Sequence, residues 1–220
     1  MTEDEWLTVN EPSPMLQFVH GKGSDRKLRL FAVACCDRIS RLISTEPGRR
    51  CVEVARRMAD GLAIPGERRA AVIAAMGDGD TTPAAACVGA VSAYEAAVRT
   101  ADHAAIAVGR EHFPELFESG DRIPEWYEIA GHEELAQSHL LRDIFGNPFR
   151  PSALDPSRVS DTARSIARSA YEDRAWDRLP ILADALEDAG CEEGELLGHL
   201  RGGGPHARGC WVVDLILGKE

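Results

Sequence analysis

The chain has 220 residues, of which 44% are hydrophobic and only 6% aromatic, and it carries 36 Asp and Glu against 25 Lys and Arg. This length and apolar content suffice for a packed core, and few aromatic residues beside abundant alanine favour helices over strands. The net charge of −11 disfavours nucleic acid and anionic membranes as partners, because both would repel the chain. The sequence therefore predicts an all-α fold, a compact bundle of about seven to nine helices with irregular Pro-rich connections.

The first residues, MTEDEWLTV, have neither a basic segment nor an apolar core, so they do not read as a signal peptide. No apolar run is long enough for a transmembrane helix. We therefore expect a cytoplasmic protein with no membrane partner. Six cysteines are too sparse for a disulfide framework and are expected to be reduced, mostly buried thiols. They are Cys35, Cys36, Cys51, Cys87, Cys191 and Cys210.

The first half of the chain shows clear helical periodicity. Ser24 can cap a helix in which apolar residues recur at steps of three and four from Leu28 to Leu42, which predicts a helix to about residue 44. Further helices are expected through Cys51 to Met58 and over about 66–76. Thr82 and Pro83 then begin a long alanine-rich segment, 84 to about 112, which predicts a central and closely surrounded helix.

The segment 113–131 contains prolines and the exposed-looking Trp126 and Tyr127, and we interpret it as a long connection. Within a single helical domain spanning 1–220, it is the place where a sub-boundary could fall. Trp126 and Tyr127 are candidates for a ligand or partner contact, although an aromatic anchor folding the connection onto the bundle explains them equally well. A helix is expected from about 132 to 145 and another from Asp155 and Pro156.

Several long segments resemble a known family. They are LRLFAVACCDRI, LLRDIFGNPFRP, AWDRLPILADALEDAGC and GPHARGCWVVDLILGKE. They are similar to segments shared by a family of proteins and modules multiplied in planctomycete bacteria, for which no activity, cofactor or catalytic residue is established. The resemblance implies a protein that recurs as a module, and it implies no chemistry.

The C-terminal segment contains the residues best suited to chemistry. If a helix begins at Pro205, then His206, Cys210 and Asp214 are four residues apart and share one face. Imidazole, thiolate and carboxylate are ligands that Zn²⁺ accepts, and His199 precedes them closely. We therefore consider His206, Cys210, Asp214 and His199 as metal ligands.

A second ligand set, Cys191, His199, His206 and Cys210, is also conceivable, although its spacing is that of no known zinc finger. The alternative is that Cys210 packs in the core beside Trp211 and that His206 caps a helix or forms a hydrogen bond. A catalytic triad on one helix face is disfavoured, because side chains that stand side by side do not converge on one reacting atom.

Three functional hypotheses follow from these patterns. The leading one is an interaction or regulatory module with a protein partner and without catalysis, because no complete catalytic constellation is present. The alternative is a zinc- or iron-binding protein, or a hydrolase, that uses the C-terminal His/Cys/Asp cluster. A small-ligand pocket between helices, lined by Trp126 and Trp211, is a third hypothesis.

Overall fold

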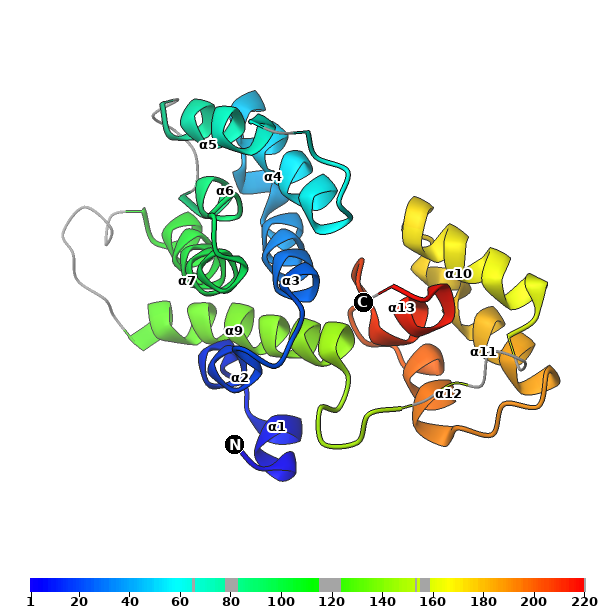
Figure 1. The fold of residues 1–220 in the computed structure, drawn as a ribbon. Coiled ribbons are helices and arrows are strands. Elements are labelled where there is room, and N and C mark those ends of the chain that lie inside the picture. Colours follow the sequence, from blue (N-terminus) through cyan, green and yellow to red (C-terminus); the bar gives the residue numbers. More distant parts are fainter. Residues whose placement is uncertain (65, 78–82, 115–123, 153, 155–158, 220) are drawn as a thin grey trace. The chain divides into compact units, whose positions relative to one another are not determined.

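The computed structural model describes residues 1–64, 66–77, 83–114, 124–152, 154 and 159–219, and all regular secondary structure in these ranges is helical (Figure 1). The prediction of an all-α fold is confirmed. The described ranges contain twelve α-helices and two 3₁₀ helices, so the expected number of seven to nine helices was too low. Short helices and an unforeseen break in one long helix account for the difference.

The chain divides into two compact units, Met1–Leu141 (unit 1) and Arg142–Glu220 (unit 2). The division falls within α9 (Pro124–Phe145), downstream of the segment 113–131. Of that segment, residues 115–123 lie outside the described part of the chain. None of the described helices is both long enough and apolar enough to span a lipid bilayer.

A hydroxyl side chain caps the start of four helices of unit 1, namely α1 (Glu3–Thr8), α3 (Asp25–Arg38), α4 (Glu46–Ala59) and α7 (Ala93–His112). Ser24 accepts a hydrogen bond from the Lys27 N–H at 3.3 Å, and Thr45 and Ser92 cap the later helices in the same way. Unit 1 also contains α2 (Pro12–Val19), η1 (Ser40–Leu42), α5 (Glu67–Gly77), α6 (Pro83–Cys87) and most of α9.

Helix α7 lies against α3 in the centre of unit 1 (Figure 1). Its buried face is built from alanines, including Ala96 and Ala104, which are both 0% exposed. Such small side chains let neighbouring helices approach closely, as the alanine-rich sequence predicted. Arg38 of α3 also donates hydrogen bonds to Glu133 of α9, which fastens α9 to the same core.

Three helix boundaries in unit 1 differ from the predicted ones. The helix expected to continue to about residue 44 ends at Arg38, and the short 3₁₀ helix η1 follows it. The helix expected over 84–112 is interrupted between α6 and α7, where Gly89 comes so close to α5 that a Cβ atom on it would lie 2.3 Å from Val72 Cγ2. The segment 113–131 is not a continuous connection, because α9 begins at Pro124 and includes Trp126 and Tyr127. Proline breaks a helix interior but is well tolerated in the first turn.

The helices of unit 2 pack against one another (Figure 1). The core between them is rich in leucine, alanine and valine. Leu182, Leu196 and Val212 are each 0% exposed within it. The unit contains the end of α9 followed by α10 (Asp161–Asp173), η3 (Trp176–Arg178), α11 (Leu179–Asp188), α12 (Gly194–Arg201) and α13 (Trp211–Leu217). Helix α10 begins after a Ser160 cap, whereas the expected start at residues 155–156 lies outside the described residues.

Candidate metal centre

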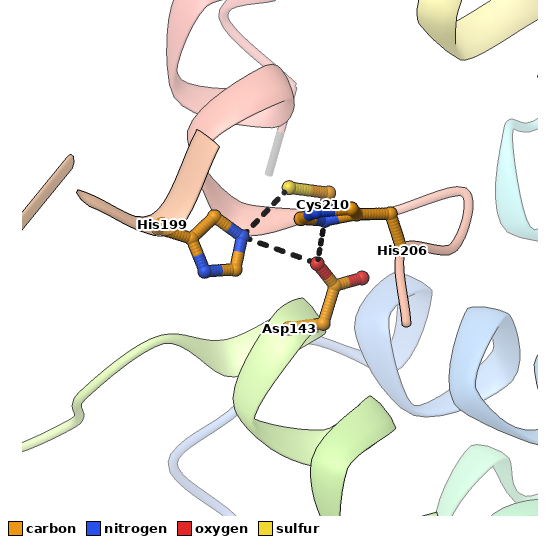
Figure 2. A group of neighbouring side chains, drawn as sticks. All are labelled: Asp143, His199, His206 and Cys210. Carbon is orange, nitrogen blue, oxygen red and sulfur yellow. Dashed lines mark hydrogen bonds and ion pairs between the residues drawn. The ribbon is translucent and has the colours of Figure 1, made fainter. Parts of the chain in front are cut away.

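Four potential metal ligands meet in unit 2: Asp143, His199, His206 and Cys210 (Figure 2). Each offers one ligand atom, and all four atoms lie within 4.8 Å of one another. Within the described part of the chain, this is the one group of three or more His, Cys, Asp or Glu residues arranged in this way. These four residues are called the metal centre below.

Helix α9 supplies the carboxylate. Asp143 lies in the last turn of α9 and is 3% exposed, with buried Leu141 and Ile144 close to it in sequence. Its Oδ2 accepts a hydrogen bond from the Ala207 N–H at 2.9 Å. This bond fixes the carboxylate so that its other oxygen, Oδ1, faces the two histidines.

Helix α12 supplies the first imidazole. Leu196 and Leu200 bury one face of this short helix in the core of unit 2, and both are 0% exposed. His199, in the last turn, is therefore held at the edge of that core, with its side chain 21% exposed. Its ring lies beside the Trp211 ring, with 5.4 Å between the centroids.

A tight turn supplies the remaining two ligands. Three residues separate His206 from Cys210, and the Cys210 N–H donates a hydrogen bond to the Ala207 carbonyl oxygen at 2.9 Å. Gly209 has φ = +100°, a conformation that favours glycine. The turn folds the chain back, and Cys210 becomes the residue immediately before α13.

The helix predicted to start at Pro205 does not form, because α13 begins only at Trp211. The one-face alignment of His206, Cys210 and Asp214 was therefore wrong as a geometric argument. His206 and Cys210 still come together, through the turn between them. Asp214 is buried in α13, with 1% exposed, and is not one of the four residues of the metal centre.

The distances within the metal centre converge on Asp143 and His199. Asp143 Oδ1 lies 2.9 Å from His206 Nδ1 and 3.2 Å from His199 Nε2. His199 Nε2 also lies 3.2 Å from Cys210 Sγ (Figure 2). A single N–H group points in one direction, so His199 Nε2 cannot make a straight hydrogen bond to both neighbours. A carboxylate oxygen, imidazole nitrogens and a thiol sulfur, all of them possible metal ligands, therefore face one small volume.

The protonation of these groups reflects both burial and their mutual contacts. Burial acts to raise the pKa of Asp143, but the hydrogen bonds from His199 and His206 outweigh it and lower that pKa. For His206, burial acts to lower the pKa, whereas the hydrogen bond and charge of Asp143 raise it above its ordinary value. Burial raises the pKa of the Cys210 thiol well above its ordinary value.

This arrangement could hold a metal ion. In a tetrahedral zinc site with bonds of about 2.0–2.3 Å, neighbouring ligand atoms lie roughly 3.2–3.8 Å apart. Three separations in the metal centre, of 2.9 to 3.2 Å, are close to that range, and all four ligand atoms lie within 4.8 Å of one another. A divalent cation with one thiolate, one carboxylate and two neutral imidazoles also has no net charge, which suits a buried position.

Sequence reasoning identified three of the four residues, namely His199, His206 and Cys210. The carboxylate is Asp143 instead of the expected Asp214. Cys191, considered as a fourth ligand, belongs to the core of unit 2, is 2% exposed and is not part of the metal centre.

The sequence contained one signal for Asp143 that was overlooked. A charged residue among the apolar residues near the end of a helix needs a partner if it is buried. The same reasoning applies to Asp102 in the alanine-rich helix. It applies with more force to Asp143, which lies between Leu141 and Ile144 in sequence.

The three aromatic candidates occupy different surroundings. Trp126 is 9% exposed and packs with Ala105 and Ala130 in unit 1. Its neighbour Tyr127 is 58% exposed and meets it edge to face. Trp211 belongs to unit 2, where it is partly buried against the core and beside His199.

Comparison of the chain with protein-family models, curated proteins and solved structures found no match. The resemblance to the planctomycete family stays a prediction. Support for a function comes from the side chains of the metal centre and their surroundings.

Proposed function

We propose that unit 2 binds one Zn²⁺ ion through Asp143, His199, His206 and Cys210, and that this ion stabilises its fold. The observation that carries the proposal is the position of His199 Nε2, 3.2 Å from a carboxylate oxygen and 3.2 Å from a thiol sulfur. A zinc ion at the common centre of these atoms would bind all of them, whereas hydrogen bonding satisfies them only in part.

Asp143 acts in this proposal as a ligand and not as a support for the histidines. A supporting carboxylate accepts a hydrogen bond from the imidazole nitrogen that faces away from the metal. Asp143 instead faces His199 Nε2, the same nitrogen that faces Cys210 Sγ. The carboxylate and the thiol would therefore both be direct ligands of the same metal ion.

Backbone groups provide the support that a zinc site needs around its ligands. The Ala207 N–H holds Asp143 Oδ2, and His206 Nε2 lies 3.5 Å from the Gly202 carbonyl oxygen, which leaves Nδ1 for the metal. Burial dominates and raises the pKa of the Cys210 thiol, whereas the backbone N–H groups of Val212 and Val213 act in the opposite direction and would hydrogen-bond a metal-bound thiolate.

The donor set favours zinc over magnesium and calcium. Magnesium and calcium prefer oxygen ligands, whereas a thiolate and two imidazoles suit zinc. Four protein ligands complete a tetrahedral shell, which is typical of a structural site, because a catalytic zinc keeps one position for water or substrate. The proposal is thus non-catalytic, and the interaction or regulatory role expected from the sequence stays a prediction beside it.

The ion would join the end of α9 to two parts of unit 2 that lie about fifty residues or more further along the chain, namely α12 and the turn before α13. Each part is short, and the residues between them contribute to one leucine-rich core. Because zinc binds only the folded arrangement, its binding free energy adds to the stability of unit 2.

Cobalt(II) substitution tests both the ligands and their geometry. We expect metal-stripped protein titrated with Co²⁺ to develop the strong visible absorption of tetrahedral cobalt, with saturation at about one ion per chain. A thiolate-to-cobalt band should accompany it in the near ultraviolet. Cys210→Ser should remove that band, and Asp143→Asn, His199→Gln and His206→Gln should each weaken binding.

His112→Gln is the matched control, because His112 is an exposed histidine at the end of α7. This variant should bind Co²⁺ as the unmodified protein does. Weak octahedral spectra, or a thiolate band that survives in Cys210→Ser, would overturn the proposal.

A further inference from the structure

Unit 1 contains a pocket that is independent of the metal centre. Its volume is about 350 Å³, and it lies between residues that precede or begin α2 and the facing sides of α7 and α9. This volume is within the range of small-molecule sites. Trp126 and Tyr127 form part of its wall.

The pocket is acidic. Glu11, Asp102 and Glu134 line it from three different elements, and none of the described residues that line it is basic. Glu134 is affected by the other two carboxylates, because burial first, and then the charges of Glu11 and Asp102, raise the pKa of Glu134. Burial likewise raises the pKa of Asp102. A cationic ligand would relieve this accumulation of negative charge.

A buried hydrogen-bond acceptor in the wall provides a second, independent observation. Gln137 lines the pocket and is 0% exposed. Its Nε2 donates hydrogen bonds to the Ala101 carbonyl oxygen at 3.1 Å and to Glu133 Oε1 at 3.3 Å, which fixes the orientation of the amide. Its Oε1 has no hydrogen-bond partner. Buried acceptors are rarely left unpaired, so this oxygen indicates a missing donor.

The ligand chemistry follows from the spacing of these groups. Among the described residues, the three carboxylates do not form a group close enough to hold a metal ion. Their charge is spread around the pocket beside two aromatic side chains, which attract organic cations through their ring faces. We infer that this pocket binds an organic cation. Its alkylammonium or guanidinium N–H groups donate hydrogen bonds to the carboxylates and to Gln137 Oε1.

Calorimetric titration of the full chain at physiological salt tests this inference. Spermidine represents a free organic cation, and the peptide Gly-Arg-Gly represents a basic side chain of a protein partner. The peptide with citrulline in place of arginine is the neutral control. Saturable binding of spermidine alone would identify a free amine as the ligand. Preferential binding of the arginine peptide would identify a protein segment.

Asp102→Asn and Glu134→Gln remove charge from the pocket with little change of shape. Each should weaken binding by about fivefold, the upper end for a partly exposed ion pair. Glu128→Gln is the control, because this exposed residue of α9 does not line the pocket, and it should leave the affinity unchanged. The inference is overturned if neither cation binds, if citrulline binds as well as arginine, or if all three variants bind alike.

Discussion

The contact between Gly109 and Trp126 gives a prediction whose size follows from the structure. A Cβ atom on Gly109 would lie 2.3 Å from Trp126 Nε1 and 2.5 Å from Cε2. The indole is rigid and only 9% exposed, so it cannot turn away without leaving Ala105 and Ala130. Overpacking of this kind costs about 1–3 kcal/mol, whereas alanine gains about 0.5–1 kcal/mol over glycine in a helix. Gly109→Ala should therefore destabilise unit 1 by about 1–2 kcal/mol.

Gly131 provides the opposite case in the same unit. It lies within α9, and a Cβ atom on it would meet nothing within 4 Å. Gly131→Ala should therefore stabilise the protein by about 0.5–1 kcal/mol. Urea unfolding followed by far-ultraviolet circular dichroism measures both changes. Equal effects of the two substitutions would refute the packing of Trp126 against Gly109.

The remaining predictions concern unit 2. Asp143→Asn should lower zinc affinity by more than the roughly 10–100-fold that loss of a supporting residue costs, measured by competition with a chromophoric chelator, and an unchanged affinity would exclude Asp143 as a ligand. In metal-free protein, the Asp143–His206 pair should stabilise the fold fully between pH 3.8 and pH 6.5, which are the ordinary pKa values of aspartate and histidine. This contribution should disappear as pH falls through the lowered pKa of Asp143 or rises through the raised pKa of His206. Thermal melts of wild type and His206→Gln in EDTA test this, since their difference should shrink at pH 8. Gly146 has φ = +67° and approaches Trp211, so Gly146→Ala should cost about 1–2 kcal/mol in urea unfolding, and no loss would contradict the close approach.

Local patterns predicted much of the fold. Helix α3 was expected because Ser24 can cap a helix and its apolar residues recur at helical spacing, and the structure shows both features. Helix α7 was expected to be closely surrounded because its sequence is rich in alanine. These features depend on residues within a few turns of one another, which a sequence displays directly.

The features that were missed depend on contacts between distant residues. Gly89, in the break between α6 and α7, packs closely against Val72, and no local pattern reveals that neighbour. Pro124 was interpreted as a helix breaker, although proline is equally at home in a first helical turn, where the structure places it.

The residues of the metal centre also divide into those that are near one another in sequence and one that is distant. His206 and Cys210 are near in sequence and were found together, but through a turn at Gly209 instead of a helix. Asp143 lies more than fifty residues before His199, so its approach depends on how unit 2 folds. A buried-charge argument could have identified Asp143 as a residue in need of a partner, but not which partner.

Metal content tests the central claim most directly. Protein purified without chelators and passed over a chelating resin should retain about one zinc per chain. Cys210→Ala should lose that zinc, whereas Cys191→Ala, which removes an equally buried thiol from the same unit, should keep it. Zinc-free wild-type protein that also fails to take up added zinc, or equal zinc in both variants, would contradict the account.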